Sequence, residues 1–327
     1  MIFVGTMVRD VGICIGILEI EADHYNPYVY PKISNTMINF LHTFNPQPIL
    51  LKLGPIEIHW YGFLMVLGGL IGLFFVIKLG NKAGLDKKIF EDLIIVFTVG
   101  AIIFARIYYV IYAWPMYRDN FWEIFKIWQG GLAVHGVMIG GFLAVLIYTR
   151  LKKLNFWQIA DHAAIGLVTA QIFGRIGNYF NQEIFGKPTD LAWGIPIDLL
   201  KRPAEYVDFD YFHPTFLYEV VGNVLVLGIL LFLWKYSETM IRDNLLRSTN
   251  YGGQARDKAD NAKMIGGRSI GIIFLSYLIL YSILRFIIGF LRIDYSPMLF
   301  GLRWPQVVSL LIIVCCLFFL LRKIVKK

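Results

Sequence analysis

Cysteine and charged residues are both scarce in this chain of 327 residues. Only three cysteines occur, Cys14, Cys315 and Cys316, and they form neither a disulfide framework nor a metal-ligand pattern. We interpret them as small apolar packing residues and expect no metal and no cofactor. Charged residues make up 17% of the chain, against about 25% in a soluble domain. This composition excludes an ordinary soluble fold.

Motifs for nucleic-acid binding are missing as well, although the net charge is +8 and the pI is about 9.2. Apolar residues dominate instead: they make up 57% of the chain, and the mean hydropathy is +0.61. Several apolar stretches approach the roughly 20 residues that cross a bilayer as a helix. We therefore expect an all-α, polytopic integral membrane protein with about seven transmembrane helices. The seven spans are predicted at 59–79, 90–112, 132–149, 157–176, 214–234, 269–290 and 305–321.

Lysine and arginine are distributed unevenly among the predicted loops. Alternate connections, together with the C-terminal end, carry 18 of them, and the opposite set carries 11. By the positive-inside rule the first set is cytoplasmic, which places the N-terminus outside and the C-terminus inside. The basic charge is then explained by membrane topology and by contact with anionic membrane lipid, so we expect no nucleic-acid partner.

Four regions follow from this pattern. Residues 1–53 form an N-terminal extension of unknown role, and 54–327 form the membrane-embedded domain. Within that domain, 177–213 is predicted to be a small extracytoplasmic head, and 235–268 a flexible, basic cytoplasmic loop. We see no internal repeat of the kind expected for a duplicated transporter.

The most informative stretch is 174–186, which reads Gly-Arg-Ile-Gly-Asn-Tyr-Phe-Asn-Gln-Glu-Ile-Phe-Gly. It places polar side chains at the end of an apolar span, where they favour a site facing protein or water. Arg175 offers a planar fork of donors that suits phosphate, and on a continuing helix it shares a face with Asn178. Asn181 and Glu183 are suited to orienting a polyol head group. The alternative is a structural knot of these residues that closes a helix end.

Two arginines lie inside predicted spans, where a charge is expensive and marks a functional site by default. Arg285 lies in the sixth span, with Arg292 two turns further on, and the pair would clamp an anionic lipid. A salt bridge from Arg285 to Glu219 is the structural alternative. Arg106 in the second span has the same two interpretations.

Three further residues are candidates for the site. His135, flanked by glycines, is suited to act as a general base because its unperturbed pKa is near neutral; an interfacial hydrogen-bonding role is the alternative. Glu219 is expected one turn into a helix that starts near His213-Pro214-Thr215, where it needs a partner inside the membrane. Tyr61 is either an interfacial anchor or a site hydroxyl.

These segments, in this order, resemble the phosphatidylglycerol–prolipoprotein diacylglyceryl transferase family of bacteria. The stretch from Gly174 to Gly186 is similar to the family signature Gly-Arg-x-Gly-Asn-Phe-x-Asn-Gly-Glu-x-x-Gly, with Tyr179 and Gln182 as departures. Weaker matches cover the remaining motifs: His59 to Gly62, Gly130 to Gly136, His213 to Glu219, and the arginines 285 and 292. In these, Val137 and Phe216 replace a family Gly and Gln, and Gly289 stands where the family often has a glutamate. The resemblance covers roughly residues 54–321.

The resemblance implies an enzyme of the bacterial cytoplasmic (inner) membrane. It would transfer the sn-1,2-diacylglyceryl group of phosphatidylglycerol to the lipobox cysteine of a prolipoprotein signal peptide, forming a thioether and releasing glycerol 1-phosphate. This is the first step of lipoprotein maturation. Catalysis would fall to His135, Arg175 and Arg285, without a metal. Substrate binding would fall to Tyr61, Arg106, Asn178, Asn181, Glu183, Gly186, Glu219 and Arg292.

Two other classes of function use the same polar residues. An anionic-lipid transporter or flippase would need the arginines but also alternating access. A non-catalytic membrane scaffold would tolerate the loss of His135 or Arg285 with its assembly intact.

Overall fold

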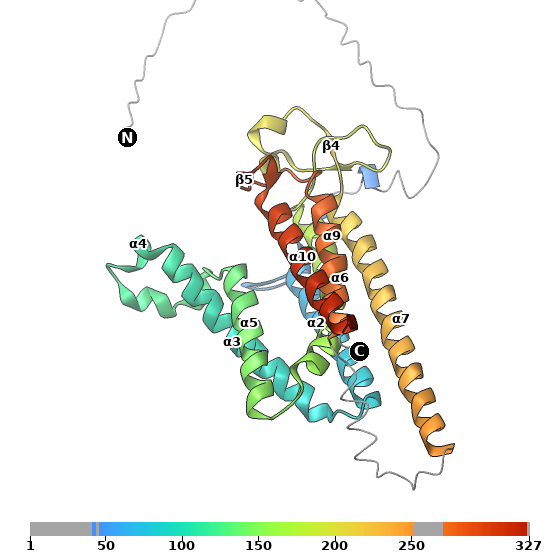
Figure 1. Ribbon diagram of the computed structural model, residues 1–327. Coiled ribbons are helices and arrows are strands. Elements are labelled where there is room, and N and C mark those ends of the chain that lie inside the picture. Colours follow the sequence, from blue (N-terminus) through green and yellow to red (C-terminus); the bar gives the residue numbers. More distant parts are fainter. Residues whose placement is uncertain (1–40, 44–45, 251–270, 326–327) are drawn as a thin grey trace, which may run out of the picture.

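The computed structural model describes residues 41–43, 46–250 and 271–325, and its main elements are helices (Figure 1). A hairpin of β1 (Ile49–Leu53) and β2 (Ile56–His59) leads into the first long helix. The long helices are α2 (Trp60–Lys82), α3 (Lys87–Tyr112), α5 (Val134–Leu151), α6 (Phe156–Asn181), α7 (Thr215–Asn250), α9 (Ile272–Ile288) and α10 (Trp304–Val325). Each of the seven predicted spans coincides with one of them.

Five of these helices, namely α2, α3, α5, α10 and the part of α7 from Thr215 to Met240, are long and apolar enough to cross a membrane. Helix α9 is apolar but shorter. Helix α6 carries several buried polar side chains along its length. The chain is therefore a mostly helical, multi-pass membrane protein, and the count of seven spans stays a prediction that the helices are consistent with.

Glycines let two pairs of helices approach closely, because they have no side chain to separate the backbones. On α2, a Cβ at Gly72 would lie 2.6 Å from the carbonyl oxygen of Gly166 on α6. On α5, a Cβ at Gly140 would lie 2.3 Å from the carbonyl oxygen of Gly100 on α3. In Figure 1, α3 and α5 form an arm to one side of the bundle that contains α6, α9 and α10.

Helices α6, α7 and α9 are held together by an apolar cluster and by a polar cap. The cluster's fully buried members include Ile165 and Val168 of α6 and Leu230 of α7. Asp161, a buried residue of α6, accepts hydrogen bonds from the backbone N–H groups of Gly271 (3.1 Å) and Phe274 (2.8 Å) at the start of α9. Helix N-termini leave such groups unsatisfied, so Asp161 fixes where α9 begins beside α6.

A small head lies at the end of the bundle where α6 ends and α7 begins (Figure 1). It contains the pair β3 (Ile195–Pro196) and β4 (Tyr211–Phe212), and the short turns η3 (Leu199–Lys201) and η4 (Ala204–Tyr206). Phe212, which is fully buried, anchors its core. A hairpin of β5 (Met298–Leu299) and β6 (Leu302–Arg303) precedes α10.

Three predicted boundaries differ from the structure. Helix α6 continues to Asn181, so the irregular chain of the head begins after that residue and not at 177. Helix α7 continues to Asn250, so the first part of the predicted loop 235–268 is helical; 251–270 lies outside the described residues. The predicted extension 1–53 includes β1, which pairs with β2, while residues 1–40 lie outside the description.

Candidate functional site

Glu219 is the centre of the polar network between α6, α7 and α9. Its side chain is fully buried, and three arginines converge on it. Arg285 of α9 donates to Oε1 over 2.7 Å, Arg292 reaches the same oxygen over 3.2 Å, and Arg175 of α6 forms an ion pair with Oε2. Three guanidinium groups thus face one carboxylate, and the centre keeps an excess of positive charge that suits a phosphate.

The arginine side chains are not fully enclosed. Those of Arg175 and Arg285 are each 19% exposed, and that of Arg292 is 9% exposed, whereas Glu219 has no exposed surface. The carboxylate is therefore enclosed by the arginines that it orients, while part of the Arg175 and Arg285 side chains reaches the surface. The sequence offered two interpretations of Arg285, a clamp for an anionic lipid and a salt bridge to Glu219. The salt bridge is present, and the clamp stays a prediction.

A chain of amides connects this centre to the end of α6. Arg175 donates from Nη1 to the Asn178 side-chain oxygen (3.1 Å), and Asn178 donates to Glu183 (2.8 Å). Asn181 donates to the same Glu183 oxygen over 3.1 Å. These contacts close the C-terminal end of α6, which is the structural alternative named above. They also connect the two amides and the Glu183 carboxylate to Arg175 in one continuous network.

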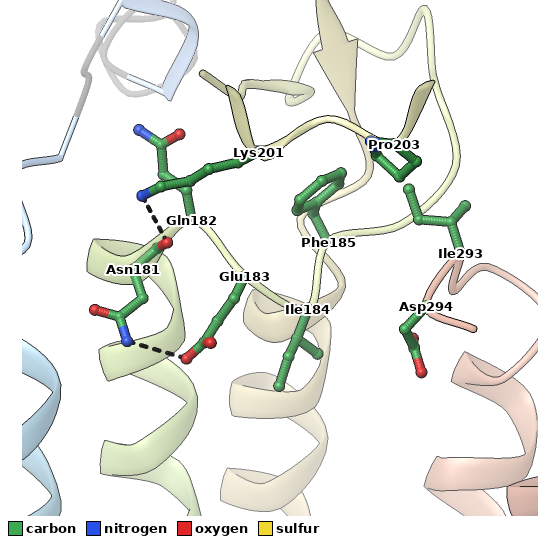
Figure 2. A pocket seen from close by; sticks show the side chains of 9 residues that line it. All are labelled: Asn181, Gln182, Glu183, Ile184, Phe185, Lys201, Pro203, Ile293 and Asp294. Atoms are coloured by element: carbon green, nitrogen blue, oxygen red, sulfur yellow. Dashed lines mark hydrogen bonds between the residues drawn. The ribbon is translucent and has the colours of Figure 1, made fainter. Parts of the chain in front are cut away.

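The outer end of this network opens into a cavity of about 440 Å³ (Figure 2). Asn181 and Glu183 lie on one side of it, with Lys201 donating to the Asn181 carbonyl oxygen over 2.8 Å. The remaining lining residues are Gln182, Ile184, Phe185, Pro203, Ile293 and Asp294. Asn181 and Glu183 are the members of the polar network that line this cavity.

Arg292 lies beyond the end of α9, which stops at Ile288, and the sequence expectation of one continuous helix is wrong at this point. A second carboxylate fixes it: its Nε donates to Asp294 over 2.5 Å, and Arg303 donates to its backbone oxygen. Burial alone would raise the pKa of Asp294. The hydrogen bond from Arg292 and the charges of Arg292 and Arg303 outweigh burial, so the pKa lies below its usual value.

The backbone of Gly186, in the loop that follows α6, pairs with the backbone of Arg292. The two residues form an antiparallel bridge, and the Gly186 N–H donates to the His213 carbonyl oxygen over 2.8 Å. A Cβ at Gly186 would lie 2.8 Å from the Leu291 carbonyl oxygen and 2.7 Å from a Thr215 methyl carbon. The predicted site glycine therefore permits a close backbone crossing, and its influence on ligand binding would be indirect.

Three predicted residues have other surroundings. Arg106 donates to the carbonyl oxygens of Glu123, Ile124, Gly130 and Gly131 at 2.7–3.0 Å, which engages most of its donors with the 121–131 segment. His135 is exposed at the start of α5 and stacks on Tyr108, with ring centroids 5.5 Å apart. Tyr61 packs against Gly177 of α6, one residue before Asn178. Contact of these residues with a substrate stays a prediction.

Gln182 and Gly289, which differ from the family motifs, are each accommodated by a tertiary contact that the sequence did not predict. Gln182 adopts the left-handed conformation at the end of α6 (φ 49°), which favours glycine, and its side-chain oxygen accepts from the Asp198 N–H over 2.8 Å. Gly289 lies against Gln306, because a Cβ there would be 2.7 Å from the Gln306 Cγ. The buried Gln306 amide in turn binds the Phe286 carbonyl oxygen and the Arg303 N–H. No local sequence pattern announces either contact, since both join distant segments.

A multi-pass helical bundle with an arginine-rich centre below a small head defines a membrane protein whose buried polar site carries an excess of positive charge. Comparison with known proteins identifies its relatives. The family model described as prolipoprotein diacylglyceryl transferase matches residues 48–249 and 260–322. The chain belongs to this family, whose members are membrane transferases.

Individual relatives agree with the family match. A phosphatidylglycerol–prolipoprotein diacylglyceryl transferase of Nostoc sp. is 42% identical over 271 residues, covering 83% of this chain and 87% of the relative. The protein of the same name from Synechocystis sp. is 40% identical over 269 residues, covering 82% and 86%. That from Listeria innocua is 38% identical over 270 residues, covering 82% and 86%.

Proposed function

We propose that this chain transfers the sn-1,2-diacylglyceryl group of phosphatidylglycerol to the lipobox cysteine of prolipoprotein signal peptides. The products are a thioether-linked lipid and glycerol 1-phosphate. The relatives' names give phosphatidylglycerol and prolipoprotein as substrates. The observation that carries the proposal is the convergence of Arg175, Arg285 and Arg292 on buried Glu219.

The reaction replaces a carbon–oxygen bond with a carbon–sulfur bond. The cysteine thiolate attacks the glyceryl carbon that bears the phosphate, and the bond from that carbon to the phosphate oxygen breaks. The thiol proton passes to a base, and the electron pair stays on glycerol 1-phosphate, which gains a negative charge. Preorganised donors directed at a developing charge are an effective form of catalysis. Arg175 and Arg285, whose side chains are each part-exposed, fit this role.

The head group would be oriented by the amide chain. With the phosphate on the arginines, the terminal glycerol extends toward Asn178, Asn181 and Glu183, which are polar groups suited to its hydroxyls. Tyr61, packed beside Gly177, supplies a further hydroxyl near the same end of α6. The two acyl chains then continue between the helices toward the membrane centre.

His135 is our proposed base for the cysteine thiol, because thiolate is the nucleophile and an exposed imidazole can take its proton. Its position at the start of α5 places it on a different helix pair from the arginines. The bound prolipoprotein would place its cysteine thiol between His135 and the arginine cluster. The nucleophile belongs to the substrate, so the chain needs no nucleophilic residue of its own.

The proposed setting is the bacterial cytoplasmic membrane, with the N-terminus and the 177–213 head outside and the C-terminus in the cytoplasm. The excess of Lys and Arg in alternate connections supports this orientation. Outward orientation of the head would present Asn181 and Glu183 to the outer leaflet. The 54–327 region would contain the whole catalytic unit.

The proposal is tested by incubating the purified full chain with phosphatidylglycerol and a lipobox peptide, followed by mass spectrometry of the peptide. A diacylglyceryl mass gain on the cysteine is expected, with no gain on a Cys-to-Ser peptide. A folded, lipid-binding protein that produces no gain would contradict the proposal. The transporter alternative is not favoured, because the family and its named relatives are transferases.

A further inference from the structure

Asn223 of α7 is the most isolated polar side chain in the bundle. It has no exposed surface, and neither its Nδ2 nor its Oδ1 has a hydrogen-bond partner among the residues that the structure describes. A buried amide without a partner costs about 1–3 kcal/mol. Such a group inside a membrane bundle points to a partner that arrives from outside the chain.

Asn223 lies one helical turn beyond Glu219, so the two side chains share a face of α7. Four residues before Arg175 on α6 lies Gln171, whose Oε1 is also buried and unpartnered among the described residues. Helix α6 runs toward the head and α7 runs away from it, and Arg175 pairs with Glu219. Gln171 and Asn223 therefore occupy the same level, about 6 Å further from the head than the arginines.

The level below is apolar. Val168 of α6 and Val226 of α7 belong to the buried cluster shared with α9, together with Tyr277. Tyr277 receives a hydrogen bond from Nε2 of Gln171 over 2.9 Å. Along the bundle axis, starting at the head, the order is the Asn178 and Asn181 amides, the arginines, a neutral amide layer, and then this mainly apolar cluster.

Phosphatidylglycerol, the lipid substrate proposed above, has the same order of groups along its length. Its head-group glycerol is followed by the phosphate, then by one glyceryl unit with two ester carbonyls, and then by the acyl chains. A carbonyl oxygen is an acceptor only, and the Asn223 amide nitrogen offers two free donors. We infer that the Asn223 amide nitrogen donates to an ester carbonyl of the diacylglyceryl group and so positions the carbon that reacts.

Asn223 has no exposed surface, so binding of a lipid carbonyl requires the packing of α7 against α9 to open beside it. The neighbouring Gly222 packs on the side chain of Leu284 of α9, since a Cβ there would be 2.4 Å from the Leu284 Cδ1. Leu284 precedes Arg285, which pairs with Glu219, so this contact lies beside the arginine centre.

This inference rests on the proposed transfer reaction and adds to it a preference for ester-linked over ether-linked lipid. The test uses the purified full chain with a lipobox peptide and either dioleoyl phosphatidylglycerol or its dialkyl ether analogue, which lacks both carbonyls. Release of glycerol 1-phosphate gives kcat/KM for each lipid. The wild-type chain is expected to prefer the diester by about five- to tenfold, the value of one good hydrogen bond.

The decisive variant is Asn223→Leu, which keeps the branched shape and the number of side-chain heavy atoms and removes the amide. It should lower kcat/KM for the diester by about the same factor, leave the diether unchanged and bring their ratio close to one. Its thermal midpoint should equal or exceed that of the wild type, because an unpartnered buried amide is removed. If Asn223→Leu does not accumulate in the membrane, Asn223→Ser removes the same reach with a smaller side chain.

Thr169→Val is the matched control. Thr169 is a buried polar residue of the same helix as Gln171, but its hydroxyl is already bonded to the Ile165 carbonyl oxygen over 2.8 Å. Its lipid preference should equal that of the wild type. An equal loss on both lipids in Asn223→Leu, or a wild type without preference, would overturn the inference. A wild type inactive on the diester would overturn the proposed function as well.

Discussion

Glu219 and Arg175 form an ion pair across two antiparallel helices, with the Glu219 side chain fully buried and the Arg175 side chain part-exposed. The same carboxylate holds Arg285 and Arg292, so one negative charge orients three positive ones. An arrangement of this kind is costly to build in a membrane. Removal of Glu219 and removal of a single arginine should therefore have different consequences.

Glu219→Gln should destabilise the protein and abolish turnover, because three guanidinium groups lose their shared counter-charge. Breaking a buried ion pair from one side costs about 3–5 kcal/mol. The thermal midpoint of the detergent-purified variant should fall by several degrees. Glu91→Gln is the control, since it breaks an exposed pair with Lys87 and should change little. An active Glu219→Gln variant of normal stability would refute the orienting role.

Arg106→Lys should loosen the 121–131 segment, because a lysine cannot satisfy the four carbonyl oxygens that Arg106 binds. Hydrogen exchange or limited proteolysis of that segment should increase. If Arg106 instead contacts the lipid directly, KM for phosphatidylglycerol will rise while exchange in the segment stays unchanged. The two measurements separate the structural interpretation from the binding interpretation.

His135→Phe should abolish lipidation while the protein remains in the membrane, because phenylalanine preserves the ring stack on Tyr108 but cannot accept a proton. The readout is the mass gain of the lipobox peptide. Turnover at the wild-type rate would exclude His135 as the base and shift attention to the carboxylates near the outer cavity.

Gln182 allows a test of how the departure from the family signature is accommodated. Gln182→Ala should lower stability by about 1 kcal/mol, because it removes the hydrogen bond to the Asp198 N–H but keeps the left-handed backbone. Gln182→Gly loses the same bond but relieves about 1 kcal/mol of backbone cost, so it should be close to the wild type. Thermal midpoints give the order, and an alanine variant as stable as the wild type would contradict it.

The helices and the charged centre were predictable from the sequence because both follow from local rules. Apolar runs of span length predict α2, α3 and α10, and an arginine inside such a run requires a partner, as Arg285 and Glu219 illustrate. The details that depend on tertiary contact were not predictable. Asp161 caps a helix more than a hundred residues away in sequence, and Gln306 fills the space beside Gly289.

Phe216 and Val137 mark the other departures from the family motifs. Phe216 is fully buried in the head cluster with Phe185 and Phe212, so an apolar ring suits that position better than an amide. Nothing in the structure explains why Val137 replaces a glycine. The departure at Phe216 is thus explained by the packing of the head.

The central claim is that the arginine cluster holds the phosphate and carries its charge as glycerol 1-phosphate leaves. The most direct measurement is the single-turnover rate of glycerol 1-phosphate release by Arg175→Lys, with phosphatidylglycerol binding measured separately and Arg150→Lys as a surface control. The account predicts about a hundredfold loss in rate with a much smaller loss in affinity, since the contact strengthens as charge develops. An unchanged rate with weaker binding alone would contradict it.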